Sequence, residues 1–224
     1  WFGIATDGST PDYDGLTMPE IDLALAQVVE DTGIEHFDLI AFDACLMGSF
    51  EVYQTVAPYA RYAVASPELI PGTGLDYTGA LFQLIDNPTM DGAGFGQAMV
   101  DSFMDFYDSS RSGYAIYNLG VADLSHVDAV GDAITHLADL IQANPLDYLD
   151  AMAIARDSTI TYGAYDDPRL SDVWSMADMK EFLALFASQV SDEAVRSASN
   201  DLISAISALL IYYRTSTPTA GDTG

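Results

Sequence analysis

The sequence predicts an α/β fold in which helices cover a mostly parallel central sheet. Residues 37–44 form a nearly unbroken apolar run with the length and character of a strand buried on both faces. A predicted helix at 46–56 and a second short strand at 62–66 follow, which is the order of a parallel crossover. The chain has 224 residues, of which 50% are hydrophobic, and this is enough to bury the core of one domain. In such a fold, active sites lie beyond the carboxyl ends of the strands.

Residues 1–15 have the composition of a loop, and a helix is predicted to follow them. Thr17 is expected to cap this helix, with Glu20 reaching back to it and Pro19 tolerated in the first turn. Gly33 suits the end of the helix. The apolar residues that fall on one helical face are Ile21, Leu25, Val28 and Val29. We therefore expect a helix that packs against the sheet.

The alternation of helices and strands continues through the middle of the chain. Helices are predicted at 77–85 and 96–107, and a strand is predicted at 114–119. Asp123 is expected to cap the next helix, whose apolar residues recur at helical spacing as far as Ile141. These segments extend the predicted α/β class beyond the first crossover.

The predicted domain is followed by a linker. Helices around 173–188 and over 192–214 complete the domain. The stretch 215–224 contains Thr, Pro, Gly and Ala in the manner of an extracellular linker, which predicts an extracellular or cell-envelope protein. The chain opens at Trp1 with neither an initiator Met nor an apolar leader. The prediction is therefore one domain over 1–214, with its N-terminal part and any targeting signal upstream.

Acidic residues dominate the charge of the chain. Asp and Glu number 34 against seven Lys and Arg, the formal net charge is -27, and Lys180 is the only lysine. This composition excludes nucleic acid as a partner, because phosphate binding needs a basic patch. No apolar run approaches the roughly 20 residues that cross a bilayer, which excludes a membrane as well. The charge either favours cationic ligands at low salt or keeps the surface soluble in a saline habitat.

Cys45 is the only cysteine, and it directly follows the predicted buried strand. A lone cysteine forms no internal disulfide and no thiolate metal cluster, so it is either a core residue or a reactive thiol. The helix predicted to begin at Leu46 would direct its positive end and free N–H groups at the sulfur and favour the thiolate. With the N–H of Cys45, those groups would also bind the oxyanion formed when a thiolate attacks a carbonyl. On position alone, a buried core cysteine remains the alternative.

The residues around the cysteine form a recognisable motif. Residues 37–48 read Phe-Asp-Leu-Ile-Ala-Phe-Asp-Ala-Cys-Leu-Met-Gly, and Glu51 and Val52 follow in the predicted helix. The next strand and turn, 62–77, read Tyr-Ala-Val-Ala-Ser-Pro-Glu-Leu-Ile-Pro-Gly-Thr-Gly-Leu-Asp-Tyr. This pattern resembles the peptidase family of clostripain, in which a strand ending in Asp-Ala-Cys-Leu-Met presents the nucleophile. The resemblance is strongest over 17–77.

The resemblance implies a caspase-like α/β/α sandwich and a catalytic dyad of Cys45 with a histidine. In the family, that histidine belongs to a His-Gly element that would lie just upstream of Trp1, so the chain alone is expected to be inactive or nearly so. The three histidines of the sequence are not candidates. His36 precedes the strand and would lie roughly 30 Å from Cys45, at about 3.3 Å per strand residue. His126 and His136 lie in a predicted helix, where a partly exposed histidine is the common interpretation.

The resemblance also implies cleavage of peptides or proteins after Arg or Lys. Asp43, the acid of Asp-Ala-Cys, would lie near the first specificity pocket, and Asp76 matches the approximate place of a second pocket acid. Carboxylates in these positions would hold a guanidinium through charge-assisted hydrogen bonds. Asp76 has an alternative interpretation as the N-cap of the helix that begins at Tyr77.

Asp7, Asp12 and Asp14 form an acidic cluster near the start of the chain, and some members of the family are described as calcium-dependent. Their spacing does not fit an EF-hand loop, because Thr10 would occupy the first ligand position and Glu20 falls one residue short of the last. The cluster is interpreted as a solvated loop with a Ca²⁺ site as the alternative, so no cofactor and no metal ligand are predicted.

The sequence thus predicts a secreted cysteine endopeptidase with Cys45 as its nucleophile. A catalytically inactive caspase-like surface or binding module is the alternative, and the residues before Trp1 distinguish the two. A hydrolase of small amides or esters is disfavoured, because its nucleophile elbow needs Gly where this chain has Asp43 and Met47.

Overall fold

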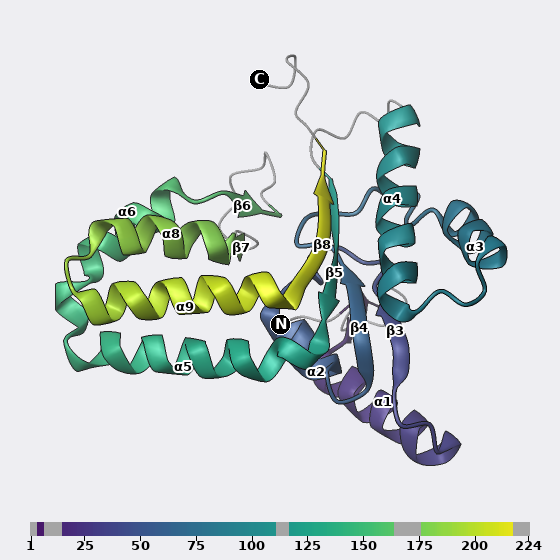
Figure 1. The fold of residues 1–224 in the computed structure, drawn as a ribbon, viewed down its shortest axis with the longest axis horizontal. Coiled ribbons are helices and arrows are strands. Elements are labelled where there is room, and N and C mark those ends of the chain that lie inside the picture. The colour runs from purple at the N-terminus through teal and green to yellow at the C-terminus, as the bar shows by residue number, and fades with distance from the viewer. Residues whose placement is uncertain (1–3, 7–14, 111–116, 164–175, 217–224) are drawn as a thin grey trace. The chain divides into compact units, whose positions relative to one another are not determined.

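The computed structural model describes residues 4–6, 15–110, 117–163 and 176–216 (Figure 1). The chain divides into two compact units. The first, the sheet unit, consists of Trp1–Ser125 and Leu210–Gly224, and the second, the helical unit, is His126–Leu209. The expected single domain over 1–214 stays a prediction, because compactness does not show which part of a chain folds independently.

The sheet unit is built around four strands. They are β3 (Phe37–Ala41), β4 (Ala60–Ala65), β5 (Asn118–Asp123) and β8 (Leu210–Thr215), side by side in that order. β3 and β4 pair in parallel, whereas β4 with β5 and β5 with β8 are antiparallel. Three of these four described strands therefore run in one direction, and β5 is reversed. The predicted α/β class, with most strands sharing one direction, is confirmed.

β3 lies at an edge of the described sheet, which corrects the prediction of a strand buried on both faces. Asp38 and Ala41 are exposed, and the other three residues of β3 are half-buried. The strand is also shorter than the apolar run, because the chain leaves the sheet after Ala41. One further hydrogen bond, from the Phe42 N–H to the Val64 oxygen (2.9 Å), holds the departing chain against β4.

The prediction of a helix over 192–214 is wrong for residues 210–214, which form a strand. Helix α9 (Glu193–Leu209) ends before these residues, and β8 follows without an intervening loop. Residues of β8 alternate between half-buried and exposed, which is the period of a strand, and Tyr213 pairs with Gly120 of β5. The β-branched and aromatic residues after Leu209 favour an extended conformation, and hydrogen bonds to the edge of β5 stabilise it as a strand.

In the described part of the sheet unit, four α-helices accompany the strands. They are α1 (Met18–Thr32), α2 (Phe50–Val56), α3 (Tyr77–Asp86) and α4 (Gly92–Ser110). The capping interaction predicted for α1 is confirmed, because the N–H and the hydroxyl of Thr17 both lie 2.8 Å from the Glu20 carboxylate. Gly33 ends α1 with a left-handed φ of 68°. Before the helix, the two-residue strands β1 (Ala5–Thr6) and β2 (Gly15–Leu16) pair antiparallel with each other.

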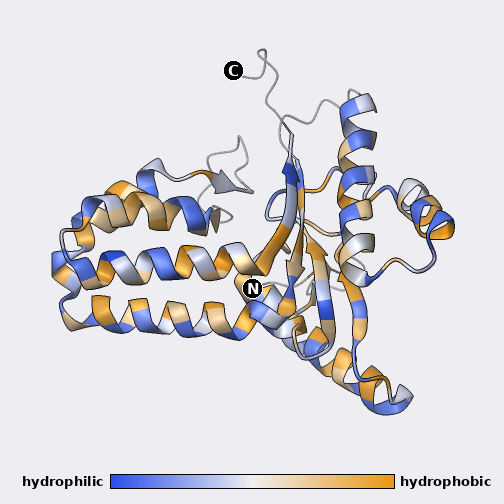
Figure 2. Cartoon of the chain, in the orientation of Figure 1, coloured by the Kyte–Doolittle hydropathy of each residue, from blue (hydrophilic) through white to orange (hydrophobic). Residues whose placement is uncertain are grey.

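Helix α4 packs across the strands of the sheet, and Figure 2 shows apolar residues concentrated along those strands. A buried cluster joins the two, with Phe103 and Met104 of α4 against Val64 and Val121 of the sheet. Close packing depends on Gly96, because a Cβ there would lie 2.9 Å from the Val121 Cγ1. The last three residues of β4, Ala63, Val64 and Ala65, are fully buried, and this end of the strand supports the loop that follows it.

The helical unit consists mainly of α5 (Val127–Ala143), α6 (Leu149–Ser158), α8 (Met179–Gln189) and α9. α9 packs against α5 and α8, and α6 packs against α8. The short strands β6 (Thr161–Tyr162) and β7 (Met176–Ala177) pair antiparallel with each other. Two short 3₁₀ helices, Leu124–His126 and Pro145–Asp147, precede α5 and α6. Within the described ranges, no helix is both long and apolar enough to span a bilayer.

Candidate active site

Cys45 lies in a turn just beyond the carboxyl end of β3, and its side chain is exposed. The turn contains Leu46, whose φ of 63° makes it the only non-glycine residue with a positive φ in the described ranges. Such a conformation is unfavourable for a branched side chain and persists only where its surroundings fix it. Leu46 is buried, and this packing holds the turn that presents the cysteine.

The helix expected directly after Cys45 begins later than predicted. α2 starts at Phe50, and the hydroxyl of its N-cap, Ser49, accepts a hydrogen bond from the Val52 N–H (3.4 Å). The residues between the cysteine and the helix form an irregular loop, because Leu46 already departs from helical geometry. The predicted start of the helix at Leu46 is therefore wrong, and Cys45 does not directly precede a helix.

The loop that carries Cys45 is joined to the loop that follows β4. The Leu46 N–H donates to the Glu68 oxygen (3.2 Å), and the Gly48 N–H donates to the Ser66 oxygen (2.8 Å). The buried Ser66 hydroxyl donates to the Asn118 Oδ1 (2.7 Å) of β5 and so fixes the second loop to the sheet. Two of the N–H groups expected to bind an oxyanion are thus already used by the fold.

The sulfur of Cys45 is in contact with this second loop. The Ile70 N–H donates to Sγ at 3.2 Å, and the Ile70 oxygen lies 3.7 Å from Sγ as an acceptor for the thiol. Among the residues that the structure describes, no hydrogen bond involves the N–H of Cys45. The thiol is therefore oriented by one loop, while no hydrogen bond within the described part of the chain occupies the backbone donor of its own residue.

Asp43 lies two residues before the cysteine and binds the same second loop. Its Oδ1 accepts a hydrogen bond from the Leu75 N–H (3.1 Å), and its Oδ2 accepts one from the Tyr77 hydroxyl (2.9 Å). Gly74 packs on the carboxylate with a φ of 75°, and a Cβ there would lie 2.5 Å from the Asp43 Oδ2. The hydrogen bond to Asp43 is the main cause that raises the pKa of Tyr77, with burial and the negative charge adding to it.

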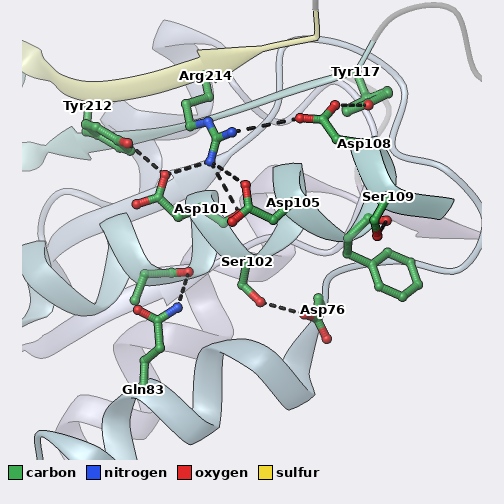
Figure 3. A network of polar contacts seen from close by, with 12 residues as sticks. Asp76, Gln83, Asp101, Ser102, Asp105, Asp108, Ser109, Tyr117, Tyr212 and Arg214 are labelled. Carbon is green, nitrogen blue, oxygen red and sulfur yellow. Dashed lines mark hydrogen bonds and ion pairs between the residues drawn. The ribbon is translucent and has the colours of Figure 1, made fainter. Parts of the chain in front are cut away.

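Asp76 is the N-cap of α3. Its Oδ1 accepts from the Gly79 N–H (3.2 Å), and its Oδ2 accepts from the Ser102 hydroxyl of α4 (2.5 Å, Figure 3). This is the geometry of the capping interpretation, and it ties α3 to α4. A part for Asp76 in substrate binding stays a prediction.

Of the three histidines, His36 belongs to the sheet unit, and His126 and His136 belong to the helical unit. His36 precedes β3 and, with Arg61 of β4 and Ser125, lines a pocket at the amino ends of these two strands. His126 directly follows Ser125, and His136 is exposed on α5. His36 therefore lies at the opposite end of β3 from the cysteine, as predicted.

The acidic cluster of Asp7, Asp12 and Asp14 lies outside the described residues. Within the described ranges, no three His, Cys, Asp or Glu side chains form a group that could hold a metal ion. The Ca²⁺ site therefore stays a prediction of the sequence.

Two site residues, Ile70 and Tyr77, were missed by the sequence analysis. A signal for both was present, because Pro71, Gly72 and Gly74 indicate a loop at the end of the second of two parallel strands. The carboxyl ends of such strands meet at one edge of a sheet, so this loop had to lie beside the cysteine.

Comparison with known proteins identifies the family. The model of the clostripain family, peptidase family C11, matches residues 3–220. No curated protein matches the sequence. Similar solved structures include a B. fragilis cysteine protease, with 17% identity over 99% of this chain and 84% of that chain, at a TM-score of 0.63.

Two further structures come from Bacteroides thetaiotaomicron. A clostripain in complex with a peptide inhibitor is 17% identical over 96% of this chain and 80% of that chain, at a TM-score of 0.56. A secreted C11 cysteine protease in complex with an irreversible peptide inhibitor is 19% identical over 96% of this chain and 52% of that chain, at a TM-score of 0.65. At such identities the structures establish a common caspase-like α/β fold, whereas the family model covers nearly all of the sequence. The chain therefore belongs to the clostripain family of cysteine peptidases.

Proposed function

We propose that this protein is an endopeptidase that uses Cys45 to cleave peptide bonds after Arg or Lys. The observation that carries the proposal is the exposed sulfur in a fixed turn at the carboxyl end of β3, two residues after Asp43, whose carboxylate binds the same loop as the sulfur. The turn leaves the sulfur accessible to a substrate, and the carboxylate supplies the charge that a basic side chain would neutralise.

The reaction follows from these groups. The Cys45 thiolate attacks the carbonyl carbon of the scissile bond, and the resulting oxyanion is bound by the Cys45 N–H. Collapse of this intermediate breaks the C–N bond, and the leaving amine takes a proton from a histidine. Water then attacks the acyl-thioester, releases the carboxylic acid and restores the thiol.

We propose that the histidine is supplied by the chain segment that precedes Trp1 in the full-length protein. The positions of two histidines support this part of the proposal. His36 lies at the amino end of β3, and His126 directly follows Ser125, which lies at the amino end of β4. Cys45 lies beyond the opposite, carboxyl end of β3. The chain by itself is then expected to be inactive or nearly so, because a thiol without its base loses most of its catalytic assistance.

Specificity for a basic residue is assigned to Asp43, with Asp76 adding negative charge nearby. Asp76 is adjacent in the chain to Leu75 and Tyr77, which both bind Asp43. The oxygens of Asp76 already accept two hydrogen bonds, so its contribution is expected to be electrostatic. The net charge of -27 would further attract cationic substrates at low ionic strength.

The test uses the full-length protein and coumarin peptides ending in Arg, Lys or a neutral residue. Cys45→Ala is expected to abolish turnover, and Asp43→Asn is expected to lower kcat/KM for basic peptides by about 100-fold, as for an interaction of about 3 kcal/mol. Asp76→Asn should lower it less. Equal turnover by the protein and Cys45→Ala would end the proposal, and a preference for neutral residues would end its assignment of specificity.

The proposal includes no cofactor, and EDTA is expected to leave turnover unchanged. It also places the protein outside the cell or at its envelope, since one structural neighbour is a secreted protease. Detection of the protein in the culture medium or envelope fraction, with a cytoplasmic marker as control, tests the location.

A further inference from the structure

The carboxylate of Asp43 is wrapped by one short segment, residues 74–77. Leu75 donates its backbone N–H to Oδ1, Tyr77 donates its hydroxyl to Oδ2, and Gly74 packs against both oxygens. A ligand must therefore approach this carboxylate from the side that the segment leaves open.

The two donors leave Asp43 able to accept further hydrogen bonds, but not equally well for every cation. A carboxylate has about four acceptor positions, two on each oxygen, and one on each oxygen of Asp43 is in use. A guanidinium binds best as a fork that needs both oxygens in one plane, whereas an ammonium is a point charge that one oxygen can satisfy. A fork must share both oxygens with a donor that is already bound, whereas an ammonium shares only one, so the Tyr77 hydroxyl on Oδ2 hinders a guanidinium more than an ammonium.

Of the two donors, the Tyr77 hydroxyl is the one that can be removed or displaced. The Leu75 N–H belongs to the backbone of a buried residue. Tyr77 is the first residue of α3, so its backbone is fixed, but its side chain is 53% exposed. Exposed side chains change rotamer within picoseconds to nanoseconds. The hydrogen bond to Asp43 raises the pKa of Tyr77, so the hydroxyl keeps its proton and remains a donor at neutral pH.

We infer that Tyr77 determines how the site selects between Arg and Lys, by occupying the Asp43 oxygen that a guanidinium fork requires. This inference rests on the proposed function, because it assigns Asp43 to the pocket for the basic residue. Tyr77 is a specificity-determining residue that touches the pocket carboxylate and takes no part in bond breaking. In its presence the site accepts Lys nearly as well as Arg.

The experiment compares the full-length protein with Tyr77→Phe on two peptides that differ only in Arg or Lys before the scissile bond. Loss of the hydroxyl frees Oδ2, so the ratio of kcat/KM for Arg to that for Lys is expected to rise roughly three- to tenfold, mainly through KM for the Arg peptide. Inhibition constants for agmatine and cadaverine provide a second measurement of the same preference without turnover.

Tyr59→Phe is a matched control, because the Tyr59 hydroxyl donates to the Asp22 carboxylate (2.6 Å) at a position remote from the cysteine. It removes the same kind of hydrogen bond and should leave the ratio unchanged. A neutral peptide and Asp43→Asn test the pocket itself.

The outcomes separate the two hypotheses. If basic peptides are preferred and Asp43→Asn removes the preference, but Tyr77→Phe leaves the ratio unchanged or lowers it, the inference about Tyr77 alone is overturned. If basic peptides are not preferred, the proposed specificity and the inference fall together. An equal loss of activity on both peptides shows a structural role for Tyr77 and also overturns the inference.

Discussion

Gly48 allows the loop that carries Cys45 to touch the loop that follows β4. A Cβ at this position would lie 2.5 Å from the Pro67 nitrogen and 2.7 Å from the Ser66 carbonyl carbon, both of them backbone atoms. Backbone atoms cannot rotate away as a side chain does, so any larger residue must separate the two loops.

Gly48→Ala is therefore expected to destabilise the protein by about 1–3 kcal/mol and to disturb the thiol. Urea unfolding measures the first effect, and the rate of alkylation of Cys45 by iodoacetamide measures the second. Gly72→Ala is the control, because a Cβ at Gly72 meets no atom within 4 Å and its φ is not positive. Equal stability of the two variants would show that the loops do not depend on this contact.

For single residues, the sequence predicted the position of Cys45 at the end of a strand, but not the loop contacts around it. The apolar run before Cys45 and the Asp-Ala-Cys-Leu-Met motif place the thiol at a strand end. The positive φ of Leu46 and the contact with Ile70 follow from how two distant loops pack together, and no local propensity encodes them.

Among the elements, helix α1 carries a pH-sensitive N-terminus. Hydrogen bonds from the Thr17 N–H, and next from its hydroxyl, lower the pKa of Glu20 below its ordinary value of 4.5. A group whose pKa is lower in the folded state stabilises the fold fully above its unfolded pKa, and this stabilisation is lost as the pH falls through the folded pKa.

Glu20→Gln is expected to lower the Tm at pH 7. Its effect should become smaller as the pH falls below 4.5 and through the lowered pKa of Glu20 in the folded protein, where the unmodified protein also loses the carboxylate charge. Thermal unfolding followed by circular dichroism over this range measures the difference. A difference that stays constant with pH would show that the carboxylate charge has no part in capping α1.

The elements themselves were predicted unevenly, for physical reasons. α1 and its cap were predicted because their signals are local. β8 was missed, because Leu210 and its neighbours continue the apolar character of α9 and become a strand only through pairing with β5. The start of α2 was placed too early, since a turn with a left-handed residue leaves no clear signal at Leu46.

For the whole molecule, 34 acidic residues stand against seven Lys and Arg, so each basic residue can offset the repulsion of several carboxylates. Arg214 of β8 lies among three carboxylates of α4, at 2.9 Å from Asp101, 3.0 Å from Asp105 and 3.9 Å from Asp108 (Figure 3). Burial and a hydrogen bond to Asp108 raise the pKa of Tyr117 to about 12, so Tyr117 remains a proton donor in this network.

Arg214→Gln is expected to destabilise the protein by about 1–3 kcal/mol at low salt, because three carboxylates spaced along one helix face then repel one another. High NaCl should restore part of this loss by screening the repulsion. Urea unfolding at two salt concentrations measures both effects. Arg61→Gln is the control, since Arg61 lies 3.9 Å from a largely exposed Asp38. Equal loss in the two variants would contradict a special role for Arg214.

The α/β class could be predicted for the molecule because strands and helices alternate around the cysteine. The division into a sheet unit and a helical unit could not be predicted. The amphipathic patterns of α5 and α9 do not show whether each helix packs against a sheet or against other helices.

The pairing of Ala122 with Leu210 has a consequence for how this architecture tolerates change. The chain leaves the sheet after β5 and re-enters it through the adjacent β8, so the helical unit is an insertion in what would otherwise be an ordinary β-hairpin. Lengthening, shortening or exchanging the inserted helices is expected to leave the register of β5 with β8 unchanged, because that register is set by the pairing of the strands themselves. We therefore expect changes in the inserted helices to leave the position of Cys45 unchanged.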